Sequence, residues 1–552
     1  PEAPVPLPDE APHLLERLAV LTPGTRITTS VHYSLQKQAQ ESVNRYALEY
    51  SSNHIHNLAA IIADVETGEV LAYAGNASFK ANEKRGNQVD VITSPRSTGS
   101  ILKPFLYAGM LHDGQILPST LVSDVPLNIN GFMPQNYNKT FNGAVPAHRA
   151  IERSLNVPLV RMLSQYNTGR FMTLLKALGM TTLRFSEEHY GASLILGGAE
   201  GTLWDLSGMY ASLSRVLTHY RLYNGRYNPE DIHPLICTGT GGASPTKAIQ
   251  SIADPRLTDK PLLSSASIWF TYEAMSALNR PEEEADWQQF ESMKQIAWKT
   301  GTSYGGRDAW AIGTTPRYVV GVWVGNASGE GRPGLTGVGN AAPVLFDLFS
   351  LLPGGDWFDI PYDELEEVAI CRSSGHKASQ ICDQVDSLYI PRSGINTPVC
   401  PYHQLIHLSA DGRFRVNSSC ESVDRMITRP WFVLPPSQEY YYRNYHIDYV
   451  PLPPIKPGCE QTKSSGQIEL IYPEHNAVLY LPKGFSGKPE KFVFKAAHAR
   501  EEATIYWHLD DTYLGETTGN HQIACRVSSG KHVLTLIDNW GNQRKILFTC
   551  TM

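Results

Sequence analysis

The sequence predicts an α/β (α+β) domain followed by a small all-β sandwich. At 552 residues, the chain is longer than one hydrophobic core usually organises, so two or three domains are expected. Apolar strand-like runs and helical patterns alternate up to about residue 352, which is typical of a mixed domain. After about residue 461, short alternating segments follow one another between turns, and this pattern predicts a sandwich.

The mixed domain begins with a predicted hairpin. The apolar runs 58–64 and 70–74 are separated by Glu66-Thr67-Gly68, and turn residues between two such runs favour antiparallel pairing. Helical periodicity then gives way to strand-like segments. We expect helices near 101–111, 149–163, 170–178, 203–216 and 264–278, and strands near 295–300, 309–313 and 318–325.

Changes in composition divide the chain into four segments. Residues 1–45 are Pro-rich and acidic before a first amphipathic helix, and we expect them to form a linker. Residues 46–355 form the mixed domain. Prolines, tyrosines and cysteines are dense in residues 356–460, which indicates a stapled connector, and residues 461–552 form the sandwich.

Net charge and hydropathy argue against two kinds of partner. The formal net charge is -7 and the pI is near 6.2, whereas proteins that bind nucleic acid are usually strongly basic. No apolar run reaches the roughly 20 residues of a membrane span. The chain opens with Pro1 rather than Met, so a membrane anchor is expected only upstream of this sequence.

Seven of the eight cysteines lie in the last third of the chain, and only Cys237 lies before it. Such crowding predicts disulfides in an oxidising compartment. A metal site is not expected, because we find no CxxC pair and no Cys/His cluster at zinc spacing. Spacing alone leaves the pairing open, but Cys525 and Cys550 lie in strand patterns of the last segment, and we expect them to be bonded.

One short segment offers the nucleophile and base of a serine acyltransferase, which also needs oxyanion donors and a group that holds the substrate carboxylate. Ser100-Ile101-Leu102-Lys103 places a lysine one helical turn after a serine, so both side chains fall on one face. A lysine serves as a base only when neutral, and burial beside a second lysine, here Lys299, lowers the pKa of a lysine.

The SxxK spacing is weak alone, so its setting has to decide. It recurs at Ser34, Ser244, Ser374 and Ser528. Only the Ser100 copy lies between Ser97-Thr98-Gly99 and an apolar helix that starts with Pro104. Two further motifs follow it in order, and three weak motifs in sequence make a strong signal. They are Ser154-Leu155-Asn156 and Lys299-Thr300-Gly301-Thr302.

The three motifs are those of penicillin-binding proteins and class A β-lactamases, and nearly the whole chain resembles the bifunctional, class A penicillin-binding proteins. The resemblance implies a penicillin-binding/serine β-lactamase-like transpeptidase domain, an Ig-like C-terminal sandwich and an N-terminal glycosyltransferase domain that precedes this chain. It implies a peptidoglycan D,D-transpeptidase that β-lactams acylate, in the periplasm with an inner-membrane anchor. The stretches are Thr28–Val31, Arg96–Phe105, Pro134–Tyr137, Leu196–Gly198, Ala297–Ser303 and Arg307–Trp310.

The resemblance also implies a role for each motif residue. Ser100 would attack the penultimate D-alanine carbonyl of a stem peptide, and Lys103 would take the serine proton. No metal or organic cofactor is implied; the partners are stem peptides and β-lactams, with cell-wall proteins as candidates for the C-terminal domain. The other roles are proton relay and amide binding by Ser154 and Asn156, electrostatic tuning by Lys299, carboxylate binding by Thr300, Gly301 and Thr302, and an oxyanion hole from the backbone N–H groups of Ser100 and Thr302.

Trp298 departs from the pattern of many relatives, which have glycine before the KTG lysine. By strand alternation, Trp298 shares a face with Thr300, so the indole would narrow the substrate cleft and contribute to substrate binding. The alternative is an indole that only packs at the sheet edge.

Two other functions compete with transpeptidation. A class A β-lactamase deacylates through a glutamate in an ExxLN-type loop, and we find no such loop in the sequence. A catalytically weak penicillin-binding sensor or scaffold would retain the fold while the sandwich performs recognition. The acyl acceptor and the ligand of the sandwich cannot be derived from the sequence, because such folds host unrelated functions.

Overall fold

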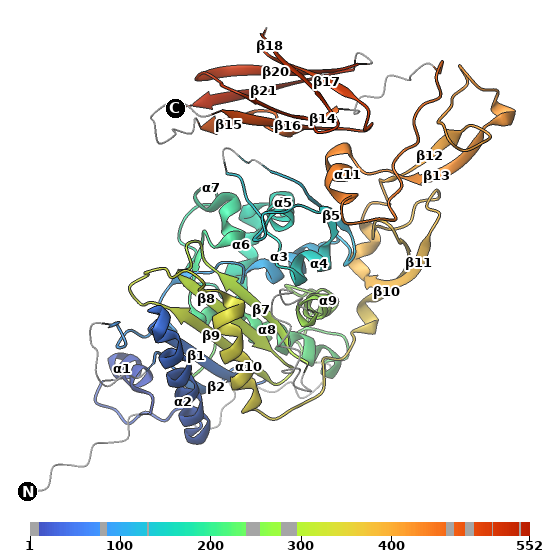
Figure 1. The fold of residues 1–552 in the computed structure, drawn as a ribbon. Coiled ribbons are helices and arrows are strands. Elements are labelled where there is room, and N and C mark those ends of the chain that lie inside the picture. The colour runs from blue at the N-terminus through green and yellow to red at the C-terminus, as the bar shows by residue number, and fades with distance from the viewer. Residues whose placement is uncertain are drawn as a thin grey trace, which may run out of the picture.

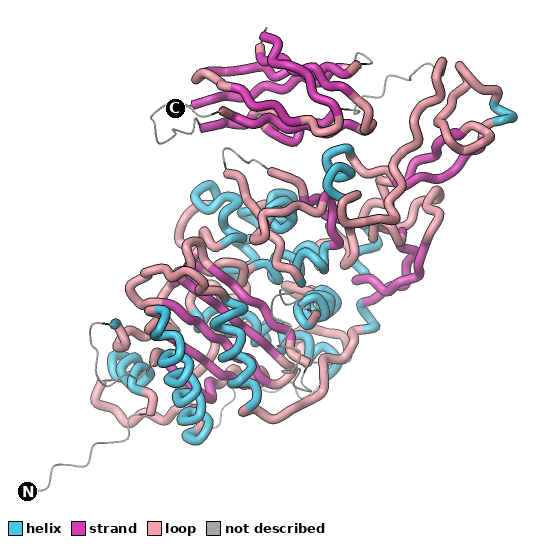
Figure 2. The backbone as a smooth tube through the Cα atoms, in the orientation of Figure 1, coloured by secondary structure: helices cyan, strands magenta, loops and turns pink. Residues whose placement is uncertain are grey.

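The computed structural model describes residues 10–21, 23–77, 85–127, 129, 132–238, 254–277, 295–459, 468–480, 491–510, 512–539 and 542–551. Figure 1 shows a mixed helix and sheet domain, a connector of hairpins and an all-strand region in chain order. Helices and strands mix in the first part, whereas every regular element in the described residues from 468 onward is a strand (Figure 2).

A five-stranded antiparallel sheet organises the mixed domain, with strand order β2-β1-β9-β8-β7. The predicted β1–β2 hairpin is confirmed, and β9 pairs with β1 although the two strands are far apart in the sequence. The strands are β1 (Asn57–Asp64), β2 (Val70–Ala74), β7 (Ala297–Thr302), β8 (Asp308–Thr314) and β9 (Tyr318–Gly325).

Helices cover both faces of this sheet (Figure 1), and alternate residues of each strand enter opposite cores. In β1, Ala59 and Ile61 join the core beneath α8 (Leu203–Leu222). Leu58 and Ala60 join the core beneath α2 (Tyr33–Tyr50) and α10 (Ala342–Ser350). Burial on both faces explains why the strands of this domain are continuous apolar runs.

The predicted helix near 149–163 is wrong as a single element. It is two helices, α4 (Ala147–Glu152) and α5 (Val157–Tyr166), because Ser154 between them has a left-handed backbone with φ of 50°. The other predicted helices are present: α3 (Lys103–His112), α6 (Thr168–Ala177), α8 and α9 (Ser265–Ser276). Two further helices are α1 (Pro12–Leu21) and α7 (Glu187–Tyr190).

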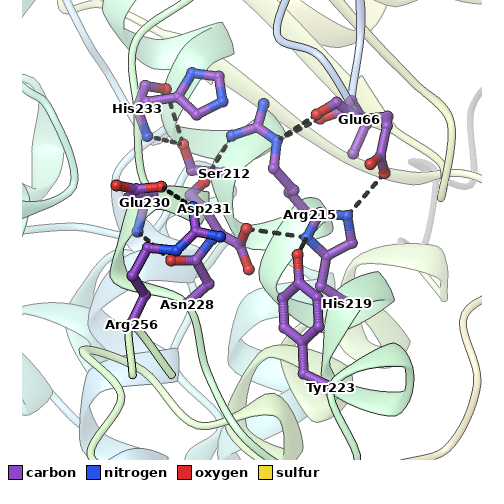
Figure 3. A network of polar contacts seen from close by, with 11 residues as sticks. Glu66, Ser212, Arg215, His219, Tyr223, Asn228, Glu230, Asp231, His233 and Arg256 are labelled. Carbon is purple, nitrogen blue, oxygen red and sulfur yellow. Dashed lines mark hydrogen bonds and ion pairs between the residues drawn. The ribbon is translucent and has the colours of Figure 1, made fainter. Parts of the chain in front are cut away.

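A polar network around the buried side chains of Arg215 and His219 lies at the end of α8 (Figure 3). His219 Nδ1 lies 2.9 Å from Asp231 Oδ1, and His219 Nε2 lies 2.8 Å from Glu66 Oε2. Arg215 donates to the carbonyl oxygens of Val65 and Asp231 at 2.6 Å each. Burial lowers the pKa of His219, but the two carboxylates outweigh this effect and raise it to about 9. The network ties the β1–β2 turn to α8.

The connector consists of two hairpins and a short helix. Strands β10 (Leu365–Cys371) and β11 (Val385–Pro391) pair with each other, as do β12 (His403–Leu408) and β13 (Ile427–Phe432). Helix α11 (Pro436–Tyr442) follows. A disulfide joins Cys420 to Cys459, in keeping with the expectation of disulfides in this segment.

The connector packs against a hairpin of the mixed domain, formed by β4 (Leu121–Asp124) and β5 (Gly143–Pro146). The backbone N–H of Leu121 donates to the Ser374 carbonyl at 2.9 Å. On the other strand, a Cβ added to Gly143 would overlap backbone atoms of α11. Leu434 completes a small apolar cluster with Leu121 of β4 and Ala144 of β5. The β4–β5 hairpin is therefore the part of the mixed domain that contacts the connector.

The C-terminal region is a two-sheet arrangement, which confirms the predicted all-strand fold. A three-stranded sheet has the order β14-β16-β19, and a five-stranded sheet has the order β15-β21-β20-β17-β18. Side chains from both sheets, such as Phe494 and Trp507, share one core. The strands are β14 (Ile468–Tyr472), β15 (Ala477–Tyr480), β16 (Phe492–His498), β17 (Thr504–Leu509), β18 (Thr512–Thr518), β19 (Gln522–Cys525), β20 (Gly530–Asp538) and β21 (Gln543–Thr551).

The predicted bond between Cys525 and Cys550 is wrong, because both residues are free thiols. Cys525 lies on β19 opposite Phe492, whereas Cys550 lies on β21 beside Leu479. Each thiol packs into the shared core from its own sheet.

Within the described residues, we find no helix that combines the length and the apolar character of a membrane span.

Candidate active site

The three motifs meet at one edge of the central sheet. Ser100 lies in the turn that precedes α3, and Lys103 is the first residue of that helix. The Ser154 to Asn156 motif occupies the break between α4 and α5. The KTG motif lies on β7, the edge strand of the sheet.

Lys103 is fully buried and held from two sides. Its Nζ donates to the Ser154 carbonyl at 2.8 Å and to Asn156 Oδ1 at 2.7 Å. Burial, followed by the charge of Lys299, holds the Lys103 pKa well below its ordinary value. A neutral amine has two N–H donors and one lone pair. In the neutral form of Lys103, these two acceptors would take both donors, and the lone pair would be left to accept a proton from another group.

Lys299 contacts the same motif from the opposite side. Its Nζ donates to Ser154 Oγ at 2.8 Å and to the Thr300 carbonyl at 2.7 Å. Burial lowers the Lys299 pKa to about 7. Two fully buried lysines with lowered pKa values are costly to maintain, and such groups cluster at functional sites.

Two glycines bring the turn before α3 against β7. A Cβ added to Gly99 would lie 2.7 Å from the backbone N and O of Thr302. A Cβ added to Gly301 would lie 2.7 Å from the Thr98 carbonyl oxygen and 3.3 Å from the Ser100 backbone N. Only glycine permits this approach, because it has no Cβ. The backbone of Ser100 is thereby held beside the end of the KTG strand.

The threonines of β7 differ in exposure and contacts. Thr300 is buried at 7% exposure, whereas Thr302 is half-buried. The Thr302 hydroxyl accepts a hydrogen bond from the Gly337 backbone N at 2.9 Å. A hydroxyl that accepts in this way can still donate its own proton. The Thr302 hydroxyl can therefore donate its proton to an anion bound beside β7.

A buried asparagine, to which the sequence analysis assigned no role, positions the second motif. Asn136 Oδ1 accepts from the backbone N–H groups of Asn156 at 3.0 Å and Val157 at 3.2 Å. Asn136 Nδ2 in turn donates to Asp124 Oδ1 at 2.8 Å, and Asp124 is fully buried. The contact satisfies N–H groups at the start of α5. The Pro134–Tyr137 stretch that carried the family resemblance was the available signal.

Trp298 lies on the face of β7 that it shares with Thr300, opposite the face of Lys299. The indole is 5% exposed and belongs to the core beneath α2 and α10. Its ring meets Phe346 of α10 edge to face, with 5.0 Å between centroids. The structure therefore favours the packing alternative for Trp298 over a role in narrowing the cleft.

Residues 58–213 match the family model described as the penicillin binding protein transpeptidase domain. Residues 457–548 match the Penicillin-Binding Protein C-terminus Family. Penicillin-binding protein 1C of Escherichia coli (strain K12) is 27% identical over 576 aligned residues, which cover 99% of this chain and 68% of that protein. The chain is a penicillin-binding protein homologue.

Other homologues match a smaller part of the chain. Penicillin-binding protein 1B of Vibrio cholerae is 25% identical over 339 residues, or 58% of this chain and 39% of that protein. The chain thus spans about two fifths of the length of that relative. The crystal structure of penicillin-binding protein 1A from Haemophilus influenzae has a TM-score of 0.53 and 15% identity, and the match covers 71% of this chain and 77% of that one. That likeness supports the fold alone.

Proposed function

We propose that this penicillin-binding protein homologue is a peptidoglycan D,D-transpeptidase that works through a serine acyl-enzyme and is acylated by β-lactams. The observation that carries the proposal is the position of Lys103, whose two N–H donors are held by Ser154 and Asn156. That arrangement leaves the lone pair of the amine to take the proton of Ser100, one helical turn earlier.

The reaction follows from the groups around Ser100. The hydroxyl oxygen attacks the carbonyl carbon of the penultimate D-alanine while its proton passes to Lys103. The backbone N–H groups of Ser100 and Thr302, which the close approach of Gly99 holds together, stabilise the oxyanion. Such a donor is worth about 3–4 kcal/mol in serine enzymes. Collapse of the tetrahedral intermediate breaks the peptide bond and expels D-alanine, whose amine takes up the proton from Lys103.

In the second half-reaction an amine of a neighbouring stem peptide attacks the ester carbonyl, the bond between Ser100 Oγ and the acyl group breaks, and the amine proton returns to Ser100 Oγ by way of Lys103. Ser154 lies between the two lysines, since its carbonyl accepts from Lys103 and its hydroxyl accepts from Lys299. We therefore assign proton relay to Ser154 and substrate-amide binding to Asn156. Lys299 sets the local charge, and Thr300, Gly301 and Thr302 bind the terminal carboxylate. Stem peptides lie in the periplasm, so the proposal places the site there.

Labelling with a fluorescent penicillin tests the nucleophile. Ser100→Ala is expected to abolish the covalent label. Ser528→Ala is the matched control, because Ser528 has the same SxxK spacing but is an exposed residue of the sandwich. A Ser100→Ala protein that labels like the parent, with the adduct mapped elsewhere by mass spectrometry, contradicts the assignment.

Release of D-alanine from a pentapeptide substrate separates an enzyme from a sensor. A transpeptidase releases D-alanine and forms a cross-linked product when an acceptor peptide is added. A sensor labels with penicillin at Ser100 but shows neither product. That result would retain the nucleophile and refute turnover.

A further inference from the structure

Four side chains of the connector converge on one point. They are three cysteines and a histidine, and their ligand atoms all lie within 4.8 Å of one another. Two of the cysteines and the histidine are buried, and the remaining cysteine is half-buried. The residues are Cys371, Cys382, Cys400 and His403.

These residues come from separate pieces of backbone. Cys371 ends β10, Cys382 lies in the loop before β11, and His403 begins β12 after Cys400. From the sequence we expected no metal site, because the spacing of the cysteines and histidines along the chain does not match a zinc motif. The Cys400-x-x-His403 pair was overlooked, and the other two cysteines approach it only when the two hairpins fold.

The distances suit one tetrahedral ion. His403 Nδ1 lies 3.5 Å from Cys371 Sγ and 3.4 Å from Cys400 Sγ. Zinc bonds sulfur at about 2.3 Å and nitrogen at about 2.0–2.1 Å, so two such ligands of a tetrahedral zinc stand about 3.5 Å apart. The side chains therefore need little movement to bind an ion at their centre.

The surroundings of the ligands have the features of a metal site. His403 Nε2 lies 3.1 Å from Asp383 Oδ1, and a metal-bound histidine usually donates its other ring N–H to such a carboxylate. The Ser379 backbone N–H donates to Cys382 Sγ at 3.3 Å, and the Ser374 hydroxyl donates to Cys400 Sγ at 3.2 Å. Donors directed at sulfur stabilise thiolates, which are the form that binds metal.

We propose that Cys371, Cys382, Cys400 and His403 bind one structural Zn²⁺ ion. Three sulfurs and one imidazole are a closed structural zinc set, with no position left for a substrate. Binding releases the thiol protons and joins β10 to β12. The apolar cluster at the first hairpin is small, with Leu117, Ile370 and Ile390 as its buried members. A lone hairpin is marginally stable, so the ion would supply much of the folding free energy of this part.

A disulfide between Cys371 and Cys400 is the competing arrangement. It would leave Cys382 and the orientation of His403 unexplained, and all three cysteines are free thiols in the structure. Zinc is also expected to protect these thiols in an oxidising compartment.

Elemental analysis of the whole chain, purified without chelator, tests the proposal. One zinc per chain is expected, and it should be released together with reactive thiols when a mercurial reagent is added. Cys382→Ser and His403→Gln should each lower the zinc content, whereas Cys237→Ala should keep it, because Cys237 is a buried thiol of the other domain. Asp383→Asn should weaken zinc binding about 10- to 100-fold without removing a ligand.

A second measurement does not depend on how the variants fold. Metal-free parent protein titrated with Co²⁺ should develop thiolate-to-cobalt charge-transfer and tetrahedral ligand-field absorption at one equivalent. The proposal would be overturned if the purified parent protein contained no zinc and developed no such bands with Co²⁺. It would also be overturned if non-reducing peptide maps showed a Cys371–Cys400 bond.

Discussion

The polar network around His219 makes the stability of the mixed domain depend on pH. His219 is 6% exposed at its side chain and lies between the carboxylates of Asp231 and Glu66. Its pKa is raised from the ordinary histidine value of 6.5 to about 9 in the folded protein. The folded state therefore holds this proton more tightly than the unfolded state does.

The sign and size follow from proton linkage. Stabilisation by protonated His219 is complete below about pH 6.5 and is lost as the pH rises to about 9. A difference of about 2.5 between the two pKa values, at about 1.4 kcal/mol for each pKa unit, gives at most about 3.5 kcal/mol. The hydrogen bond to His219 is the main reason why the pKa of Glu66 is lowered. The Glu66 shift therefore reflects the same interaction, and its free energy is not added to that of His219. Glu66 is also 64% exposed at its side chain and screened by solvent.

Calorimetry between pH 6 and pH 9.5 measures this loss. The transition of the mixed domain is identified as the one that shifts on acylation by a β-lactam. Its midpoint should fall by several degrees between pH 6.5 and pH 9, and His219→Gln should flatten that slope. His407→Gln is the control, because His407 is an exposed residue of the connector. An unchanged midpoint in the parent, or an equal slope in His219→Gln, would refute the reasoning.

Three further outcomes are expected. Gly99→Ala should slow acylation by about 100-fold and also lower the thermal midpoint, because the added Cβ meets the Thr302 backbone and Gly99 has a φ of +52°; an unchanged rate would refute the close approach. Trp298→Ala should cost about 3–5 kcal/mol yet leave the ratio of acylation rates for bulky and small β-lactams unchanged; a raised ratio would revive the cleft-lining alternative. Removing the Cys420–Cys459 bond, whose partners are 39 residues apart, should cost the connector about 4 kcal/mol, measured as a lower thermal midpoint.

The sequence predicted which motif residues come together better than it predicted the residues that hold them in place. Ser100 and Lys103 are close in the chain, so their relation follows from helix geometry alone. The order of the motifs indicated that Ser154 and Lys299 belong with them, and Lys299 does contact Ser154. The contact of Asn136 with the start of α5 depends on a loop conformation, which residue spacing does not encode.

Elements that depend on long-range packing were harder to predict. The periodicity of 149–163 continues through Ser154, so the helix break there was missed. Strand alternation put Trp298 and Thr300 on one face of β7. It could not predict that Trp298 packs against α10 on that face, because the contact depends on the tertiary fold. Cys371 and Cys382 likewise approach Cys400 and His403 only when the two hairpins fold together.

The contacts on both sides of the β4–β5 hairpin bear on how this protein can be divided. In a modular protein, the catalytic domain can be separated from the next domain, or joined to a different one, without loss of its fold. Here the connector contacts the hairpin whose Asp124 supports Asn136, and that asparagine fixes the start of α5. A fragment ending near residue 352 would expose Leu121 and Ala144, which now pack against Leu434. The connector and the transpeptidase domain are therefore expected to be inherited and exchanged as one unit.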